Sequence, residues 1–254
     1  MKRSVVPWLL AAALVGLALA LPPIAQPLWY HDFADQRACC GLPNCLDTAS
    51  NLLFVLAGAL GLLFLRGAAA RHTFTDSSER ALYALFFGAV VLIGLASGYY
   101  HLAPDNAGLA WDRAAIMLAF MTWFAAIIGE RVGLQVGLRL LPPLLLTGLA
   151  SVAWWYWSET QGMGDLRFYL LMQLLPILLI PLLLWLYPPR YSGGRNILAV
   201  IGLYLLALLF DLADRPVFAL TGGLVSGHTV KHVIAALAAL MVLRYLRRRR
   251  LFFF

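Results

Sequence analysis

The sequence predicts an all-α membrane protein with a seven-transmembrane-helix core and one additional N-terminal hydrophobic helix. Hydrophobic residues make up 62% of the 254 residues and charged residues only 12%, whereas a soluble domain of this size needs a more polar surface. The apolar residues also fall into runs of about 20, which is the length that crosses a bilayer. None of the runs shows the alternating pattern of a membrane barrel, so helices are expected.

Eight apolar runs follow one another with little polar sequence between them. The polar remainder is too short for a separate soluble domain. We therefore expect two parts, an N-terminal hydrophobic segment at 1–29 and a seven-helix membrane domain at 30–254. The runs lie at approximately 5–25, 47–66, 80–100, 111–129, 140–157, 167–187, 196–212 and 225–245.

The first run has two interpretations. Lys2 and Arg3, the apolar stretch and the small-residue triplet Ala18-Leu19-Ala20 are typical of a signal peptide. The stretch is also long enough to span a membrane, and prolines follow it, which favours an uncleaved helix. In both cases residues 30–47 are expected outside the cytoplasm.

The charged residues predict the orientation. Most lysines and arginines fall on the side where the first run starts, and a cluster from Arg247 to Arg250 follows the last run. Positive charge marks the cytoplasmic side, so we expect a cytoplasmic C-terminus and acidic loops outside. The net charge of +7 does not indicate nucleic-acid binding, because the terminal cluster stands where a topology anchor and anionic-lipid contact belong. Trp154, Trp155 and Trp157 are typical of an interfacial aromatic belt.

All three cysteines lie in the loop between the first and second runs. Because this loop is expected outside the cytoplasm, a disulfide is permitted there. Either Cys39 or Cys40 could pair with Cys45 and close a short loop, and the odd count leaves at least one thiol free.

Three groups of ionisable and hydroxyl residues stand at the predicted outer helix ends, where such residues at membrane depth are costly and informative. Ser97 and His101 close the third run, four residues apart and so on one helix face. Asp112 lies near the start of the next helix, and the short connection between the two helices is expected to bring it beside His101. His228 and His232 start the last helix, again four residues apart.

These residues indicate a metal site. The spacing of His228 and His232 is one by which a helix gives two imidazoles to one metal, and His101 would be the third ligand. Zinc with three protein ligands keeps a fourth position for water and lowers its pKa towards neutrality. Asp112 could take the proton of that water or orient it, and Ser97 could support the developing oxyanion or the metal-bound water. We therefore predict a zinc site formed by the three histidines, with Asp112 and Ser97 as catalytic residues.

The order and spacing of these residues resemble the alkaline ceramidases, members of a superfamily of seven-helix membrane hydrolases that includes the adiponectin receptors. Ser97, His101, Asp112, His228 and His232 match the family pattern. The segment 44–52 also looks like the family's opening of the first core helix, and the likeness covers residues 30 to 245. It implies a zinc-dependent membrane hydrolase that cleaves the amide bond of a ceramide-like N-acyl lipid.

The resemblance also implies a calcium site in the loop before the core. The equivalent ligands are Asp32, Asp35 and Asn44, with the Phe33 carbonyl as a fourth, and oxygen ligands suit calcium. The loop aligns only with a gap, Arg37 falls where an asparagine is expected, and Asn44 replaces an acid. Acids that cap a solvated loop explain the same residues.

Two further polar groups accompany the site. Lys231 lies inside the histidine pair, where the family usually has an aromatic residue. It would favour an anionic head group or extend to the interface. Asp211, Asp214 and Arg215, at one outer helix end, are interpreted as a neutralising network rather than as part of a substrate mouth.

Other functions compete with the hydrolase. A receptor or sensor of the same fold would hold zinc structurally, with a closed fourth position. A haem electron carrier would use the histidines as axial ligands, but two haems need separated ligands and His228 and His232 converge on one point. A retinal protein built on Lys231 leaves the histidines without a purpose. A proton-coupled transporter predicts inverted repeats or matching broken helices, which we do not find.

Overall fold

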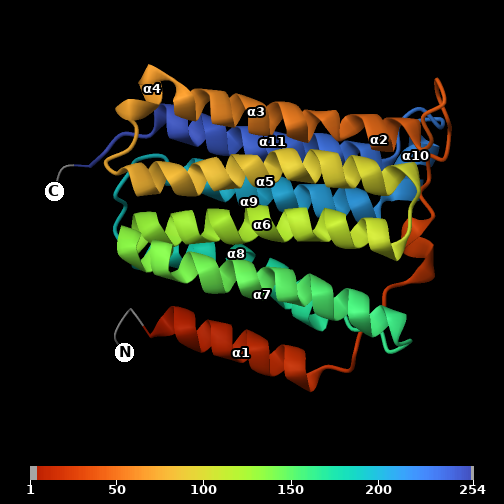
Figure 1. Cartoon of the computed structure of the whole chain (residues 1–254), viewed down its shortest axis with the longest axis horizontal. Coiled ribbons are helices and arrows are strands. Elements are labelled where there is room, and N and C mark those ends of the chain that lie inside the picture. The colour runs from red at the N-terminus through yellow and green to blue at the C-terminus, as the bar shows by residue number, and fades with distance from the viewer. Residues whose placement is uncertain (1–4, 253–254) are drawn as a thin grey trace.

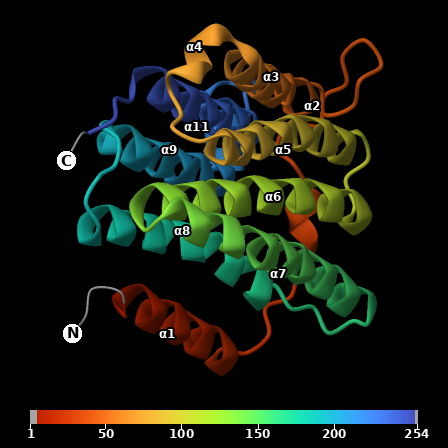
Figure 2. The same cartoon turned by 60° about the vertical axis from the view of Figure 1, so that its left-hand side comes forward.

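The computed structural model describes residues 5–252 as a bundle of elongated helices lying side by side (Figures 1 and 2). Within this range the β-structure is confined to isolated bridges, Cys39 with Leu42 and Tyr191 with Leu251. The helices are α1 (Val6–Ala20), the 3-10 helix η1 (Leu28–His31), α2 (Cys45–Ser50), α3 (Leu52–Arg66), α4 (Ala68–Arg71), α5 (Ser77–Leu102), α6 (Asn106–Arg131), α7 (Leu134–Thr160), α8 (Arg167–Leu186), α9 (Gly194–Leu212), α10 (Asp214–Leu220) and α11 (Gly227–Arg248).

Seven helical segments in the described range are long and apolar enough to cross a membrane. α2 and α3 together form the first, Cys45–Arg66, and the others are α5, α6, α7, α8, α9 and α11. Large apolar side chains such as Leu63, Leu146 and Trp185 are exposed on their outer faces. An extended apolar exterior of this kind belongs in lipid rather than in water. The predicted all-α fold, with seven long apolar helices and a shorter N-terminal one, is confirmed.

The shorter helix, α1, lies at the edge of the bundle and packs against α8 (Figure 1). Its 15 residues extend about 22 Å, less than the roughly 30 Å of a hydrocarbon core. The chain that follows is tied to the core: the Leu166 amide donates to the Ile24 carbonyl at 2.8 Å, and the Gln26 amide donates to Glu159 Oε1 at 2.6 Å. A boundary after residue 29 stays a prediction. Lys2 and Arg3 lie outside the described residues.

α6 is the central helix and packs against α5, α7 and α8. Glycines set the closest approaches around it. A Cβ on Gly137 of α7 would lie 2.5 Å from the Ala125 carbonyl oxygen of α6, and one on Gly148 of α7 would lie 2.9 Å from Met121 Cγ of α6. Small residues at such crossings let helix backbones pack closely in a membrane.

The C-terminal arginines do not form the uniform surface cluster that the sequence indicated. Arg247, Arg248 and Arg250 are exposed, but Arg249 is buried. Its guanidinium donates to Glu79 Oε1 at 2.9 Å and to Glu130. Arg249 is buried because the two buried glutamates each need a positive partner in the protein interior. Arg249 therefore joins the bundle instead of contacting lipid head groups.

The loop between α1 and α2 contains a disulfide between Cys39 and Cys45. Cys40 is free and exposed. The Cys39 and Leu42 backbones exchange two hydrogen bonds, of 3.1 and 2.9 Å. The sequence left both pairings with Cys45 open, and the folded turn selects Cys39.

Candidate metal centre and cavity

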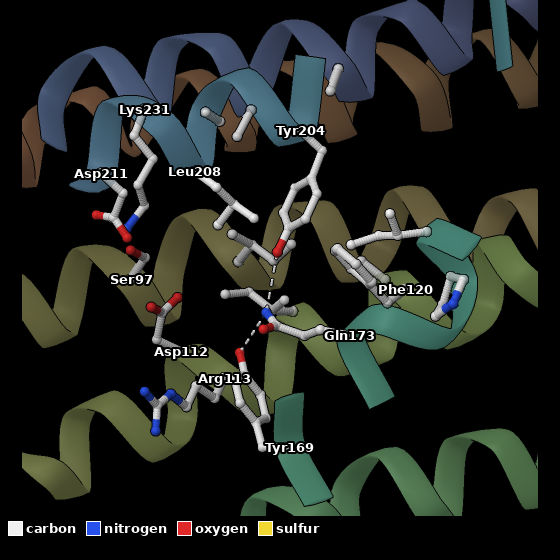
Figure 3. A pocket seen from close by; sticks show the side chains of 18 of the residues that line it. Ser97, Asp112, Arg113, Phe120, Tyr169, Gln173, Tyr204, Leu208, Asp211 and Lys231 are labelled. Carbon is white, nitrogen blue, oxygen red and sulfur yellow. Dashed lines mark hydrogen bonds and ion pairs between the residues drawn. The ribbon is translucent and has the colours of Figure 1, made fainter. Parts of the chain in front are cut away.

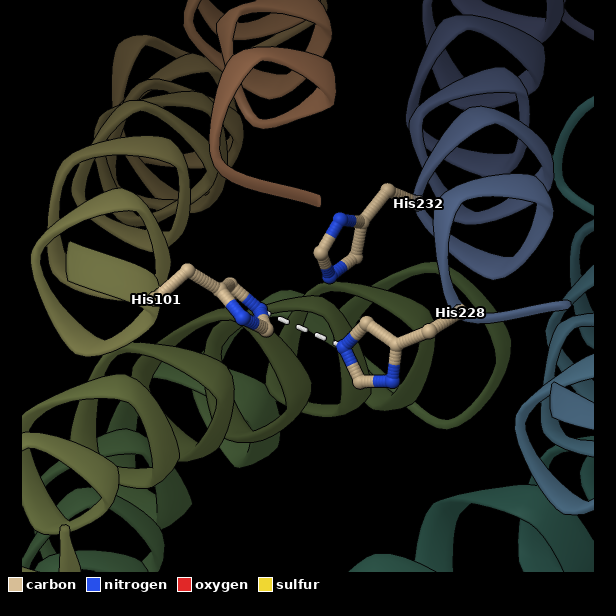
Figure 4. A group of neighbouring side chains, drawn as sticks. All are labelled: His101, His228 and His232. Atoms are coloured by element: carbon tan, nitrogen blue, oxygen red, sulfur yellow. Dashed lines mark hydrogen bonds between the residues drawn. The ribbon is translucent and has the colours of Figure 1, made fainter. Parts of the chain in front are cut away.

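Three buried histidines meet where α5 ends and α11 begins (Figure 4). His101 lies in the last turn of α5, and His228 and His232 lie one turn apart in α11. Each offers a ring nitrogen, and these three atoms lie within 4.8 Å of one another. The predicted group therefore comes together as a cluster that could hold a metal ion such as zinc.

The geometry of the cluster suits a tetrahedral metal. Nε2 of His228 lies 3.2 Å from Nε2 of His101. Two imidazole nitrogens bound to one tetrahedral zinc, each about 2.0–2.1 Å from it, are separated by roughly 3.3–3.4 Å. The observed separation is close to that edge, so the two rings need little movement to share an ion.

Neighbouring side chains fix the ring orientations of the two α11 histidines. Nδ1 of His228 lies 2.9 Å from Asp211 Oδ1, and Nδ1 of His232 lies 2.8 Å from Ser50 Oγ. Each of these contacts engages Nδ1 rather than Nε2, which is the arrangement by which outer partners prepare histidine for a metal. Nδ1 of His101 is buried and has no hydrogen-bond partner within residues 5–252.

The start of α11 is held tightly in place. A Cβ on Gly227 would lie 2.3 Å from the Phe210 carbonyl oxygen, so only glycine allows this approach to α9. Asp214 accepts from the His228 amide at 2.9 Å and from the Ala34 amide at 2.8 Å. These contacts join the α11 terminus both to α10 and to the loop after η1.

Asp47 supports the same terminus from α2. Its buried carboxylate accepts from the Ser226 hydroxyl at 2.8 Å and from the Thr229 hydroxyl at 2.5 Å. Its carbonyl accepts from the side chains of Ser50 and Asn51. Asp47 thus connects the N-cap of α11 to the serine that contacts His232, a role that sequence reasoning missed.

Ser97 and Asp112 both line a cavity that also reaches His232 (Figure 3). Both side chains are buried, and Oδ1 of Asp112 has no hydrogen-bond partner in the described part of the chain. Figure 3 shows the Asp112 carboxylate pointing towards Ser97. An unpartnered carboxylate oxygen in a cavity is free to accept a proton or a hydrogen bond from a bound molecule.

Lys231 points into this cavity (Figure 3). Its ammonium lies 3.0 Å from Asp211 Oδ1 and 3.3 Å from Nε2 of His228. The interpretation that it extends to the membrane interface is wrong, because Asp211 holds it inside the bundle.

The predicted network of Asp211, Asp214 and Arg215 is divided in the structure. Asp211 contacts His228 and Lys231, and Asp214 accepts from backbone amides. Arg215 instead forms an ion pair with Asp32. The three side chains therefore do not form one network. Asp211 belongs to the candidate site, where it orients the His228 ring.

The structure also places the predicted calcium ligands. Asp32 is paired with Arg215, and Asp35 is paired with Arg37, whose hydrogen bonds hold the pKa of this carboxyl below its usual range. Asn44 donates from Nδ2 to the His101 carbonyl at 2.8 Å. Since each carboxylate already has a guanidinium partner, this arrangement gives no support to the calcium site, which stays a prediction.

Phe33, whose carbonyl was the fourth predicted calcium ligand, lies against the histidine cluster. Its ring packs against His101 and His228, with centroid distances of 4.6 and 4.5 Å. Its carbonyl accepts a hydrogen bond from Gln36. The loop after η1 therefore covers the histidine cluster with an apolar ring.

The cavity has a volume of about 440 Å³ and is lined by α3, α5, α6, α8, α9 and α11 together with residues 24–30. Its charged side chains, Asp112, Arg113, Asp211 and Lys231, lie on one side of Gln173 and Tyr204 (Figure 3). From Asp112 to Trp123 along α6 it extends roughly 16 Å. Apolar side chains line this deeper part: Phe86, Val90, Ile116, Ala119, Phe120, Trp123, Ile177, Val200, Ile201, Ala235, Ala238 and Ala239.

The fold and the site define a class: a membrane protein of seven long apolar helices with a buried histidine triad able to hold a metal ion. No protein-family model and no curated protein sequence matches the chain.

Proposed function

We propose that the protein is a zinc-dependent membrane hydrolase that cleaves the amide bond of a ceramide-like N-acyl lipid to a free fatty acid and an amine. One observation carries the proposal: Ser97, Asp112 and His232 of the histidine cluster line the same largely apolar cavity. A long acyl chain matches the deep part of the cavity, and a polar amide matches the group of side chains at the end. The resemblance to the alkaline ceramidases supports the same reaction.

Zinc held by His101, His228 and His232 would supply a Lewis acid and hydroxide at neutral pH. Asp112, with its unpartnered Oδ1, accepts the proton of the attacking water and later passes it to the leaving nitrogen. Ser97 donates a hydrogen bond to the carbonyl oxygen as negative charge develops on it. Water oxygen forms the new bond to the carbonyl carbon and the carbon–nitrogen bond breaks, which gives one carboxylic acid and one amine.

The proposed orientation places the site at the non-cytoplasmic face and the C-terminus in the cytoplasm. The exposed Arg247, Arg248 and Arg250 lie at the end of the bundle opposite the histidines. This asymmetry supports a cytoplasmic position for that end. The lipid would then enter from the outer leaflet, between helices that line the cavity.

The experiment that tests the proposal is a metal analysis followed by an activity assay. The purified protein should contain about one zinc per chain, as three histidines at one site predict. The variant His228→Ala/His232→Ala should lose the zinc and the release of fatty acid from N-acyl lipids. Folded protein without zinc under zinc-replete conditions would rule the mechanism out.

A second candidate, a receptor or sensor with structural zinc, is favoured by one contact. The Lys231 ammonium lies 3.3 Å from Nε2 of His228 and so narrows access to that ring. A site closed in this way would bind zinc without turnover. Stoichiometric zinc together with no hydrolysis across a panel of N-acyl lipids would select this function.

A further inference from the structure

Arg113 is a buried charge that the proposed mechanism does not use. It follows Asp112 on α6, and only 5% of the residue is exposed. Figure 3 shows its guanidinium turned away from the Asp112 carboxylate. Within residues 5–252, Arg113 takes part in no ion pair, whereas the buried Arg249 has two acidic partners. Burial of an unpaired cation is costly, so we expect an anionic ligand to bind here and supply the missing counter-charge.

The contacts of Arg113 hold the guanidinium in one orientation without neutralising it. Nη2 donates to Gln26 Oε1 at 2.6 Å, whereas Nη1 is buried with no hydrogen-bond partner in the described chain. The guanidinium lies over the Trp155 ring at 4.0 Å and near the Tyr169 ring at 4.8 Å. Aromatic faces attract the cation and fix its plane, but they supply no counter-charge.

Neither Glu159 nor Asp112 accepts a hydrogen bond from Arg113 in the described chain, where the guanidinium donates to Gln26. Glu159 Oε1 accepts from the Gln26 amide and from Trp155 Nε1. Asp112 points towards Ser97, as Figure 3 shows. The guanidinium therefore keeps donor capacity for a ligand.

Arg113 lines the same cavity as Ser97, Asp112 and Lys231. These groups occupy one end of the cavity, with Lys231 and Arg113 at the two sides and Ser97 and Asp112 between them (Figure 3). A lipid whose acyl chain fills the deep part and whose amide lies beside Ser97 and Asp112 would bring its head group near Arg113.

We propose that Arg113 is a head-group subsite that binds a carboxylate, and that the preferred substrates are N-acyl amino acids rather than neutral N-acyl lipids. A planar guanidinium with free donors matches the geometry of a carboxylate, which accepts two parallel hydrogen bonds. This inference deepens the proposed function, and only the statement that these ligands are substrates rests on the proposed hydrolase activity. The binding preference itself needs no turnover.

The test compares ligands that differ only in the charge of the head group. N-lauroylglycine and its methyl ester are titrated into the protein in nanodiscs, with empty nanodiscs as the reference for partitioning. We expect the acid to bind at least about tenfold more tightly than the ester, as for a charge-assisted paired hydrogen bond. The preference for the acid should disappear in Arg113→Gln. Arg113→Lys keeps the positive charge but loses the two parallel guanidinium donors, so it should retain only part of the preference.

Arg215→Gln is the matched control, because Arg215 is an exposed arginine that pairs with Asp32 in the loop region. This variant should keep the full preference. Equal binding of acid and ester by the wild-type protein would overturn the subsite. A preference that persists in folded Arg113→Gln would assign the anion to another residue. Tighter binding of a phosphate monoester of the same chain length would overturn the choice of carboxylate.

The same titrations in His228→Ala/His232→Ala separate this inference from the proposed function. Selective binding of the acid in a variant without hydrolysis supports the subsite by itself. Zinc-dependent hydrolysis of neutral and anionic N-acyl lipids at equal efficiency would support the hydrolase and overturn the subsite. Selective binding without any hydrolysis by the wild-type protein would support the subsite and overturn the hydrolase.

Discussion

Buried polar atoms without partners mark the candidate site at the scale of single residues. Oδ1 of Asp112, Nδ1 of His101 and Nη1 of Arg113 are all buried and lack a hydrogen bond within the described chain. Each such atom costs about 1–3 kcal/mol when nothing satisfies it. Asp112 and Arg113 line the cavity, and His101 belongs to the neighbouring histidine cluster. We therefore expect a substrate, water or metal to supply the missing contacts.

Asp112→Asn should reduce hydrolysis while zinc stays bound. An amide cannot accept the proton of the attacking water, so the rate should fall by a factor on the order of 10²–10⁴. Fatty-acid release and zinc content are measured on the same preparation. Asp76→Asn is the control, because Asp76 is the exposed N-cap of α5 and asparagine caps equally well. Undiminished activity of Asp112→Asn would remove the residue from the mechanism.

Ser50→Ala should weaken zinc binding. The serine hydroxyl fixes the His232 ring through Nδ1, and loss of such an outer partner typically lowers metal affinity about 10–100-fold. Competition with a chelator gives the affinity. Ser97→Ala removes a hydroxyl from the cavity wall that is not part of the histidine cluster, and it should leave the affinity unchanged. Equal zinc affinity of Ser50→Ala and the wild-type protein would contradict this role.

At the scale of elements, the turn between α7 and α8 fastens α1 to the bundle. Asp165 accepts from the Arg167 side chain, Nε and Nη2, each at 2.8 Å. Nη1 of Arg167 in turn donates to the Leu21 carbonyl at the end of α1. Arg167 hydrogen bonds lower the pKa of Asp165 from 3.8 to about 2. The turn is therefore expected to loosen in acid.

The sign of this pH effect follows from the lowered pKa. The stabilisation is present at pH values above the unfolded pKa of 3.8 and is lost as pH falls through the folded pKa of about 2. Asp165→Asn should lower stability near neutral pH by on the order of 1 kcal/mol, after allowance for solvent screening. The difference from the wild-type protein should vanish near pH 2. Unfolding in detergent across this range measures it, and a constant difference would contradict the assignment.

At the scale of the whole molecule, the two ends of the bundle have different tasks. One end holds the histidines and the polar part of the cavity. At the other end, Arg249 lies between Glu79 and Glu130, and the hydroxyls of Tyr83 and Tyr245 donate to Glu130 at 2.6 and 2.7 Å. This network joins α5, α6 and α11, so it keeps together helices that also carry His101, Asp112 and His232.

Arg249→Ala should destabilise the bundle strongly, because it leaves two buried carboxylates without a cation. The cost of removing one partner of a buried ion pair is about 3–5 kcal/mol. Unfolding in detergent at neutral pH measures the loss. Arg248→Ala, which removes an exposed arginine one position earlier, should have little effect. Similar stability of the two variants would show that the network contributes nothing.

Helix content and the position of the histidines were predictable from the sequence because both depend on local periodicity. Runs of apolar residues fix the helices to within a few residues, as for the run 80–100 and α5. Spacing of four residues places His228 and His232 on one face. Trp155 shows the limit of such reasoning: it is fully buried beneath Arg113, not in the interfacial belt that its neighbours indicated.

The sequence by itself determined a membrane bundle with three histidines at one end, because composition and helical periodicity act over short stretches of chain. Only the tertiary structure decided which distant groups meet. It placed Ser50 against His232, Asp211 against His228, and Arg249 between two glutamates. Burial makes these pairings necessary, since a charge or polar group removed from water must find its partner inside the protein. That requirement depends on how helices pack, which no local pattern records.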